Sequence, residues 1–356
     1  MAARRPTITA RRSASIATLI LLPLVLVAGA IVVLPEARQL VGLAADPAPT
    51  GGAAATEAPA TDSPEPSLAV PSATPYVPGP VDIAWTHERL DDALRWGSLR
   101  LAPPGMVASV LFPDGHIWTG SAGVADLATR RALTPDTPFP IASISKTFLA
   151  AEILSLVDEG IVTLDDAVAA RLPGLLVGDR PINVAITIRQ LLDHTSGLRD
   201  FLLNAKLNRA VLADHAATWT LETALAFAGA PIAKPGVGYH YANTNYVLLG
   251  LIAESATGRS LAAEYRARFF EPLGLQSATY QGVEQPVMEL PAAYVYATNK
   301  LDEIPADLGD GTAIRPFTSV ITAAGAAGSI AASAPDLARW AQALYGGAVV
   351  SAAGTA

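Results

Sequence analysis

The sequence predicts a mixed α/β (α+β) fold, with an antiparallel sheet flanked by helices, and three observations point to it. A β-rich hairpin pattern opens the folded part, helical spacing of apolar residues dominates the middle, and the composition suits a large core. Of the 356 residues, 51% are hydrophobic and 16% are charged, a balance too apolar for disorder. We therefore expect one large domain, residues 81–356, behind two shorter segments.

The first segment, residues 1–40, has the pattern of a membrane anchor. An arginine-rich stretch precedes an apolar run at residues 16–34. A helix of that length spans about 28 Å, close to the roughly 30 Å hydrocarbon core, and its positive flank stays in the cytoplasm. We therefore expect a single-pass anchor in the cell membrane with an extracytoplasmic catalytic domain. Small residues at 28–30 also fit a cleavage site, so secretion after signal cleavage is the alternative.

The second segment, residues 41–80, has the composition of a linker. Residues 45–80 contain nine prolines and almost no bulky apolar side chain. Such a stretch cannot bury enough apolar surface to offset the entropy cost of ordering its backbone. We expect a disordered tether that presents the domain away from the membrane.

Composition and charge exclude several classes of function. The chain has no cysteine, which rules out disulfides, thiolate nucleophiles and iron–sulfur clusters. The five histidines lack the close pairing that zinc enzymes use, so we expect no metal and no cofactor. Residues 41–356 hold 19 basic and 31 acidic side chains, a net charge of about −12. Such a surface repels phosphate backbones, and we expect no nucleic-acid binding.

The folded domain opens with a helix and a hairpin. In residues 87–96, Leu90, Ala93 and Leu94 share one helical face. Residues 106–112 and 116–122 are β-rich and flank a Pro-Asp-Gly turn. Two strands joined by so short a turn predict an antiparallel pair.

Helices dominate the rest of the domain. Apolar residues recur at helical spacing from Pro140 until Gly160, which is placed to end the helix, and Ser143 lies near its start. Further helices are expected at residues 188–194, 246–255, 261–270 and 335–344, the last with Ser333 as its cap.

Ser143 and Lys146 form a Ser-x-x-Lys arrangement at a helix start. Three residues are nearly one turn, so both side chains project from one face and the ammonium can lie beside the hydroxyl. The unpaired N–H groups at a helix N-terminus also stabilise an anion there. A capping serine followed by a solvated lysine would give the same pattern.

Tyr241 and Asn243 form a Tyr-x-Asn arrangement just before the predicted helix at 246–255. A half-buried aromatic residue and a turn residue would explain this motif alone. Both motifs in this order occur by chance in only about 3% of such chains. Their co-occurrence therefore favours a functional interpretation.

Together these stretches resemble the serine β-lactamase-like and penicillin-binding-protein superfamily, which includes class C β-lactamases and D-alanyl-D-alanine carboxypeptidases. The 98-residue separation of Ser143 and Tyr241 suits that family. The resemblance runs from about residue 85 to the end and implies a β-lactamase/D,D-peptidase-like fold, in which an all-helical region adjoins the sheet and the active site lies between them. Further similar stretches are Phe-Pro-Ile-Ala at 139–142, Leu-Leu-Asp-His-Thr-Ser-Gly-Leu at 191–198, Tyr-Ala-Asn-Thr-Asn-Tyr-Val-Leu-Leu-Gly at 241–250 and Glu-Pro-Leu-Gly-Leu at 271–275.

The resemblance also implies roles for the motif residues. Ser143 would be the nucleophile with its backbone N–H as an oxyanion donor, Lys146 the electrostatic partner, Tyr241 the general base and then acid, and Asn243 a substrate-binding donor. Lysine and tyrosine both have a pKa near 10, so the site must lower one of them, and which one stays open. His194, in a loop, is expected to bond the backbone rather than complete a Ser-His-Asp triad.

One element of the family pattern is missing. The Lys-or-His-x-Gly motif, which supplies the second oxyanion donor and a carboxylate-binding group, does not occur after Asn243. The sequence also stops just after a predicted helix, without a closing strand pair. We expect a domain truncated at its C-terminus, and a natural variant without the motif is the alternative.

The resemblance implies an extracytoplasmic serine hydrolase that forms an acyl-enzyme on Ser143. A D-alanyl-D-alanine carboxypeptidase acting on cell-wall peptides is favoured, because an anchor and a tether keep an enzyme near its polymer. A class C-type β-lactamase or an esterase of the same fold is the alternative, as is a non-catalytic wall-binding or sensor relative. The expected partners are a peptide, β-lactam or ester substrate and the membrane, and the oligomeric state stays open.

Overall fold

The computed structural model describes residues 83–294 and 313–351. The expected anchor and tether, residues 1–40 and 41–80, lie outside this range. In the described part, no helix is both long and apolar enough to cross a membrane. The described residues from Arg89 onward belong to one compact unit.

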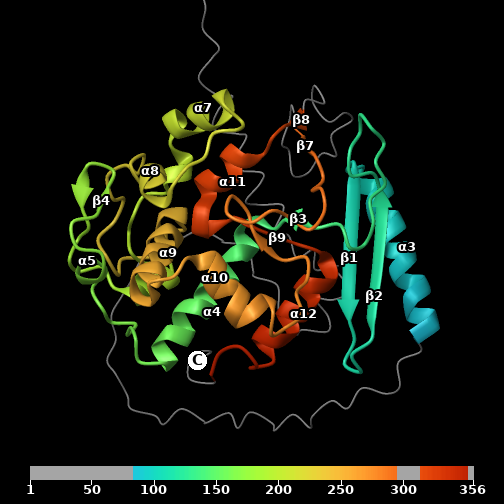
Figure 1. Ribbon diagram of the computed structural model, residues 1–356, viewed down its shortest axis with the longest axis horizontal. Coiled ribbons are helices and arrows are strands. Elements are labelled where there is room, and N and C mark those ends of the chain that lie inside the picture. The colour runs from blue at the N-terminus through green and yellow to red at the C-terminus, as the bar shows by residue number, and fades with distance from the viewer. Residues whose placement is uncertain (1–82, 295–312, 352–356) are drawn as a thin grey trace, which may run out of the picture. The chain divides into compact units, whose positions relative to one another are not determined.

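The predicted helix and hairpin open the fold (Figure 1). The three elements are α3 (Ile83–Leu101), β1 (Gly105–Leu111) and β2 (Ile117–Gly123). The strands pair antiparallel along their full length, within one residue of the predicted bounds. Gly115 in the turn has a φ of 86°, which glycine adopts without steric cost. The indole N–H of Trp118 donates to Asp91 Oδ1 at 3.1 Å and ties the hairpin to α3.

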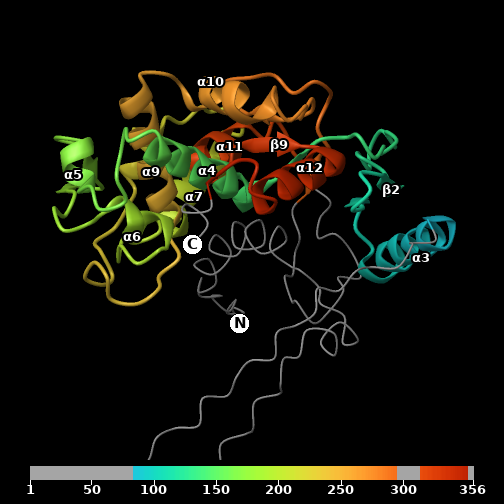
Figure 2. The ribbon, with the colours of Figure 1, turned by 90° about the horizontal axis from the view of Figure 1, so that it is seen from below.

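A second antiparallel sheet lies at the centre of the fold. Its strands, in spatial order, are β3 (Phe139–Pro140), β9 (Ile330–Ala332) and β6 (Thr279–Tyr280). The middle strand β9 is buried along its whole length. In Figure 2, α10 lies on one side of β9 and α12 on the other. The sheet therefore fixes the chain just before Ser143 against a strand about 190 residues later.

The remaining elements are mostly helical. They are η1 (Ala142–Ile144), α4 (Ser145–Asp158), α5 (Val168–Arg171), β4 (Leu176–Val177), β5 (Arg180–Pro181), α6 (Ile188–Leu192), η2 (Phe201–Leu203), α7 (Ala205–Ala213), α8 (Leu221–Leu225), α9 (Asn243–Thr257), α10 (Leu261–Tyr265), the π-helical turn η3 (Arg266–Phe270), β7 (Ala293–Tyr294), β8 (Ala313–Ile314), α11 (Thr318–Ala324), η4 (Gly325–Ala327) and α12 (Ala334–Tyr345). The mixed α/β fold with an adjoining helical region is thus confirmed.

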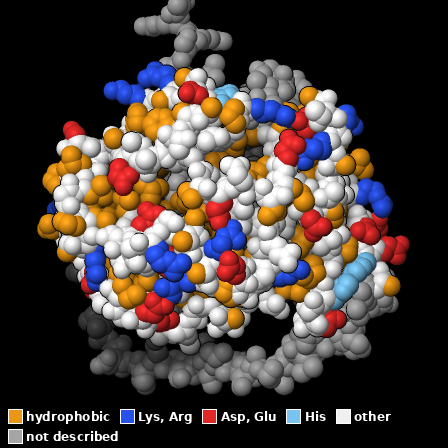
Figure 3. Space-filling model, in the orientation of Figure 1, with side chains coloured by type: hydrophobic (Ala, Val, Ile, Leu, Met, Phe, Trp, Pro, Cys, Tyr) orange, Lys and Arg blue, Asp and Glu red, His pale blue; other side chains and the backbone are white. Residues whose placement is uncertain are grey.

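The helices α4 and α9 pack against each other in the interior (Figure 1), and their first turns carry Lys146 and Asn243, the last residue of each sequence motif. Gly160, with a φ of 71°, follows the end of α4 as predicted. Ser333 caps α12 by accepting the backbone N–H of Asp336 at 3.4 Å, also as predicted. On the face in Figure 3, acidic and basic side chains are interspersed, so neither sign dominates the field there.

Three predicted helix bounds need correction. The helix expected at 246–255 begins at Asn243, so this residue lies in its first turn. The helix expected at 188–194 ends at Leu192, because His194 has a φ of 60° and cannot continue it. The helix expected at 261–270 changes after Tyr265 into the π-helical turn η3.

An aromatic cluster holds the start of α4 in place. The rings of Phe148 on α4 and Trp340 on α12 stack with centroids 3.8 Å apart. Phe269 and Phe270 meet Phe148 edge-on. The indole N–H of Trp340 also donates to Thr147 Oγ1 at 2.8 Å, which fixes the helix turn that carries the Ser-x-x-Lys motif.

Candidate active site

Ser143 lies in a tight turn between a strand and a helix. The strand β3 ends at Pro140, and the single turn η1 leads directly into α4. Ala142 has a φ of 47°, in the left-handed region that residues with a side chain rarely adopt. Such a conformation persists only where the surroundings hold it, and it occurs often at functional sites. Ser143 itself is half-buried.

Lys146 lies one turn after Ser143 and is buried, with 6% of its surface exposed. Its Nζ donates to Ser143 Oγ at 3.1 Å, to Asn243 Oδ1 at 2.8 Å and to the carbonyl of Ala327 at 2.8 Å. These three bonds use all the donors of an ammonium. Burial lowers the pKa of Lys146 to about 7, against the opposing charge of Asp200. The neutral amine of Lys146 is therefore populated near pH 7.

Tyr241 approaches Ser143 from the segment before α9. Its hydroxyl lies 2.9 Å from Ser143 Oγ, and Lys146 Nζ lies 5.1 Å from the centre of its ring. Burial raises the pKa of Tyr241, so its phenol is protonated at neutral pH. Of the two groups that the sequence left open, Lys146 is thus the one whose basic form is populated near pH 7.

Asn243 connects Lys146 to a carboxylate that the sequence motifs did not reveal. Its Oδ1 accepts from Lys146, and its Nδ2 donates to Asp200 Oδ2 at 2.8 Å. One amide hydrogen of Asn243 is then left for a substrate. Asp200 also accepts the N–H of Leu202 at 2.9 Å. Burial raises the pKa of Asp200, while these hydrogen bonds lower it. Its place two residues after the 191–198 stretch was the only sequence signal.

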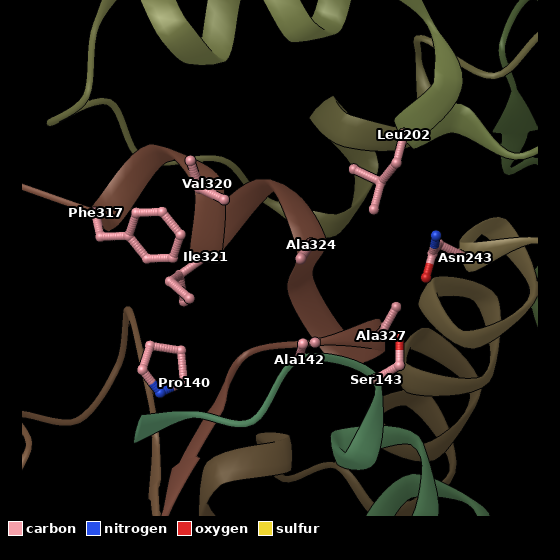
Figure 4. Close-up of a pocket in the computed structure, with 11 residues that line it drawn as sticks. Pro140, Ala142, Ser143, Leu202, Asn243, Phe317, Val320, Ile321, Ala324 and Ala327 are labelled. Atoms are coloured by element: carbon pink, nitrogen blue, oxygen red, sulfur yellow. The ribbon is translucent and has the colours of Figure 1, made fainter. Parts of the chain in front are cut away.

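An apolar pocket opens beside Ser143 and Asn243 (Figure 4). The helix α11 contributes the bulky side chains Val320 and Ile321, next to Phe317. No charged side chain lines the pocket, so it suits an uncharged group. The other lining residues are Pro140, Ala142, Leu202, Ala324, Ala327 and Gly328. Sequence patterns gave no list for this pocket, because its walls come from four separate segments.

The structure also bears on His194 and on possible metal sites. Nδ1 of His194 accepts the backbone N–H of Ala242 at 3.2 Å, which confirms that this side chain bonds the backbone. Within residues 83–294 and 313–351, no three or more acidic or histidine side chains gather in a group that could hold a metal ion.

The model of the family described as Beta-lactamase matches residues 98–356 of the chain. Penicillin-binding protein 4 of Amycolatopsis lactamdurans is 36% identical over 200 residues, which cover 56% of this chain and 49% of that protein. A D-aminopeptidase of Brucella anthropi is 36% identical over 185 residues, 49% of this chain and 32% of that protein. The chain thus spans half or less of the length of these two relatives.

Solved structures show the same fold. The D-stereospecific amidohydrolase of a Streptomyces species is 29% identical, with a TM-score of 0.63 over 77% of this chain and 76% of that one. The D-amino acid amidase of Ochrobactrum anthropi SV3, complexed with L-phenylalanine amide, is 26% identical, with a TM-score of 0.64 over 75% of this chain and 72% of that one.

Proposed function

Because the chain belongs to the beta-lactamase family of serine hydrolases, we propose that it forms an acyl-enzyme on Ser143 and hydrolyses amide bonds next to D-amino acid residues. In this proposal Ser143 is the nucleophile, Lys146 and Tyr241 move its proton, and Asn243 donates to the substrate amide. The curated relatives named above, a penicillin-binding protein and a D-aminopeptidase, support this substrate class.

The observation that carries the proposal is the hydrogen bonding of Ser143 Oγ to both Tyr241 and Lys146. When Ser143 Oγ attacks the carbonyl carbon, its proton passes to this pair, and the pair returns a proton to the leaving nitrogen. Water then attacks the acyl carbon, its proton passes to the same pair, and Ser143 regains a proton as the acid product leaves. Because Lys146 has a pKa of about 7, it can accept and release that proton near neutrality.

The charge that develops on the carbonyl oxygen needs a donor of its own. Ser143 lies in the first turn of η1, where backbone N–H groups have no carbonyl of a preceding turn to bond. Its backbone N–H is therefore our candidate for one oxyanion donor.

Within this class we place a D-alanyl-D-alanine carboxypeptidase acting on cell-wall peptides first. The similarity to a penicillin-binding protein supports this choice. We further propose that residues 1–40 anchor the chain in the cell membrane and that the hydrolase lies outside the cytoplasm, where such an enzyme meets its polymer.

The apolar pocket favours a second candidate, hydrolysis of D-amino acid amides or of amino-terminal D-residues. An uncharged side chain of the acyl group fits against Val320 and Ile321, while Ser143 at the rim meets the carbonyl carbon. The similarity to a D-amino acid amidase and a D-aminopeptidase supports this second candidate.

Product analysis separates the candidates. The full chain is incubated with a stem pentapeptide ending in D-Ala-D-Ala, with D-phenylalanine amide and with a fluorescent penicillin, beside its Ser143→Ala and Ser155→Ala variants. Release of the terminal D-alanine supports the carboxypeptidase, release of ammonia supports the amidase, and rapid turnover of the drug supports a β-lactamase. Activity in the parent and Ser155→Ala but not in Ser143→Ala is expected. If none of these substrates, nor any short acyl ester, is hydrolysed in a way that depends on Ser143, the proposal is contradicted and a non-catalytic relative is favoured.

A further inference from the structure

His194 contacts the chain on both sides of Tyr241. Its carbonyl accepts the N–H of His240 at 2.8 Å, and its Nδ1 accepts the N–H of Ala242 at 3.2 Å. Between these bonds, its imidazole stacks on the Tyr241 ring, with centroids 4.4 Å apart and planes 30° apart. One residue thus holds the backbone before Tyr241, the ring of Tyr241 and the backbone after it.

A chain of hydrogen bonds determines the tautomer of this histidine. The N–H of Leu198 donates to Ser196 Oγ at 3.1 Å, and the Ser196 hydroxyl donates to Asn245 Oδ1 at 2.6 Å. The amide nitrogen of Asn245 therefore faces His194 Nδ1, at 3.0 Å. Two donors, from Asn245 and the backbone, now point at Nδ1, so this nitrogen is unprotonated and the proton is on Nε2.

The surroundings keep His194 in this state. Only 7% of its surface is exposed, and burial together with the charge of Lys146 lowers its pKa to about 4. The imidazole is therefore neutral, and Nδ1 remains an acceptor, at any pH near neutrality. The φ of 60° at His194 lies in the left-handed region, a strained conformation that the surrounding contacts must hold.

We propose that His194 is a positioning residue that fixes the Tyr241 hydroxyl on Ser143. This inference rests on the proposed function, because it concerns the proton path of the same site. The hydroxyl lies 2.9 Å from Ser143 Oγ at the end of a side chain whose ring and flanking backbone His194 contacts. A displacement of about 1 Å at such a group costs about 100-fold in rate.

Two substitutions separate the contacts of His194. His194→Phe keeps a ring beside Tyr241 and removes the Nδ1 acceptor. His194→Asn keeps an acceptor near that position and tolerates the positive φ, but it loses the stacked ring. His116→Asn, at an exposed histidine of the β1–β2 hairpin, is the matched control.

The first readout is the acylation rate of Ser143 by penicillin, in the parent and in a Tyr241→Phe background. If His194 acts through Tyr241, His194→Phe slows acylation about 10- to 100-fold in the parent, with little change in the half-saturating concentration. His194→Asn, which keeps an acceptor, slows acylation less than His194→Phe does. In the Tyr241→Phe background both substitutions change the acylation rate by less than about twofold, since the hydroxyl that His194 positions is gone. Equal losses in the two backgrounds would overturn the inference.

The second readout does not depend on catalysis. The chain is labelled with 3-fluorotyrosine, and the fluorine resonance of residue 241 is assigned by its loss in Tyr241→Phe. His194→Phe is expected to shift or broaden this resonance, and His116→Asn to leave it unchanged. If the resonance responds but the parent never acylates, the proposed function fails and the positioning role stands. If neither His194 variant moves the resonance, the positioning role is wrong whatever the acylation rate.

Discussion

Replacing Asp200 by asparagine should move the pH dependence of the reaction toward acid. Asp200 and Lys146 are joined through Asn243, with hydrogen bonds of 2.8 Å on either side of the amide. Asparagine keeps the shape of Asp200 and can turn its one acceptor oxygen toward Asn243 Nδ2, so the change removes the negative charge and keeps that contact, although it gives up the hydrogen bond from the Leu202 N–H. The charge of Asp200 favours the ammonium form of Lys146, and its loss lowers the lysine pKa further below 7.

The size of the effect depends on the separation of the two charges. Two hydrogen bonds and one amide group put Lys146 Nζ and the Asp200 carboxylate about 7 Å apart, an interaction of about 2 kcal/mol at an effective dielectric of about 20. That free energy corresponds to a shift of about 1.5 pH units. In the proposed mechanism the neutral lysine accepts the proton, so the acid limb of kcat/KM, expected near pH 7 in the parent, should move to about pH 5.5.

The assay is the rate of Ser143 acylation by a chromogenic β-lactam from about pH 5 to about pH 9, a range that brackets the expected limb. The groups facing Lys146 are Ser143, Tyr241, Tyr246 and Asp200, with His194 acting at longer range. Asp193→Asn, at an exposed carboxylate of the same loop, is the control and should leave the limb in place. An unmoved or alkaline-shifted limb in Asp200→Asn would refute the electrostatic reasoning.

Three other predictions concern single side chains. Lys146→Met should slow acylation by about 10³-fold in stopped-flow measurements, because it removes the proposed proton acceptor. The control Lys206→Met, on the exposed face of α7, should leave the acylation rate unchanged. Ile321→Asp should raise KM for D-phenylalanine amide more than for D-alanine amide, because a charge in the apolar pocket costs desolvation; equal changes would argue against the pocket. Burial raises the pKa of Glu152 to about 7 from 4.5, so its ionisation destabilises the folded state increasingly as the pH rises from about 4.5 to 7. Glu152→Gln should then raise the free energy of unfolding by up to about 3 kcal/mol at about pH 8 and by almost nothing at about pH 4, in urea titrations.

The parts of the fold that local patterns determine could be predicted from the sequence. Helical spacing placed α4, α9 and α12, and the Pro-Asp-Gly turn placed the hairpin, within a few residues. The strand β9 was missed, because Ile-Ala-Ala has neither the alternation nor the β-branched content of a strand. Its conformation comes from pairing with β3 and β6, which are distant in sequence.

The candidate site divides in the same way. The structure brings Ser143, Lys146, Tyr241 and Asn243 together, as the two motifs predicted. Asp200 could not be predicted to join them, because its role depends on a loop that folds back onto the first turn of α9. The four segments that form the apolar pocket likewise meet only through tertiary packing.

The intact mass of the full chain after incubation with a fluorescent penicillin tests the central claim, a nucleophilic Ser143, most directly. We predict a single covalent adduct on the parent and on Ser155→Ala, and none on Ser143→Ala. Peptide mapping should place the adduct on Ser143. An adduct of equal yield on Ser143→Ala, or mapped to another residue, would contradict the account.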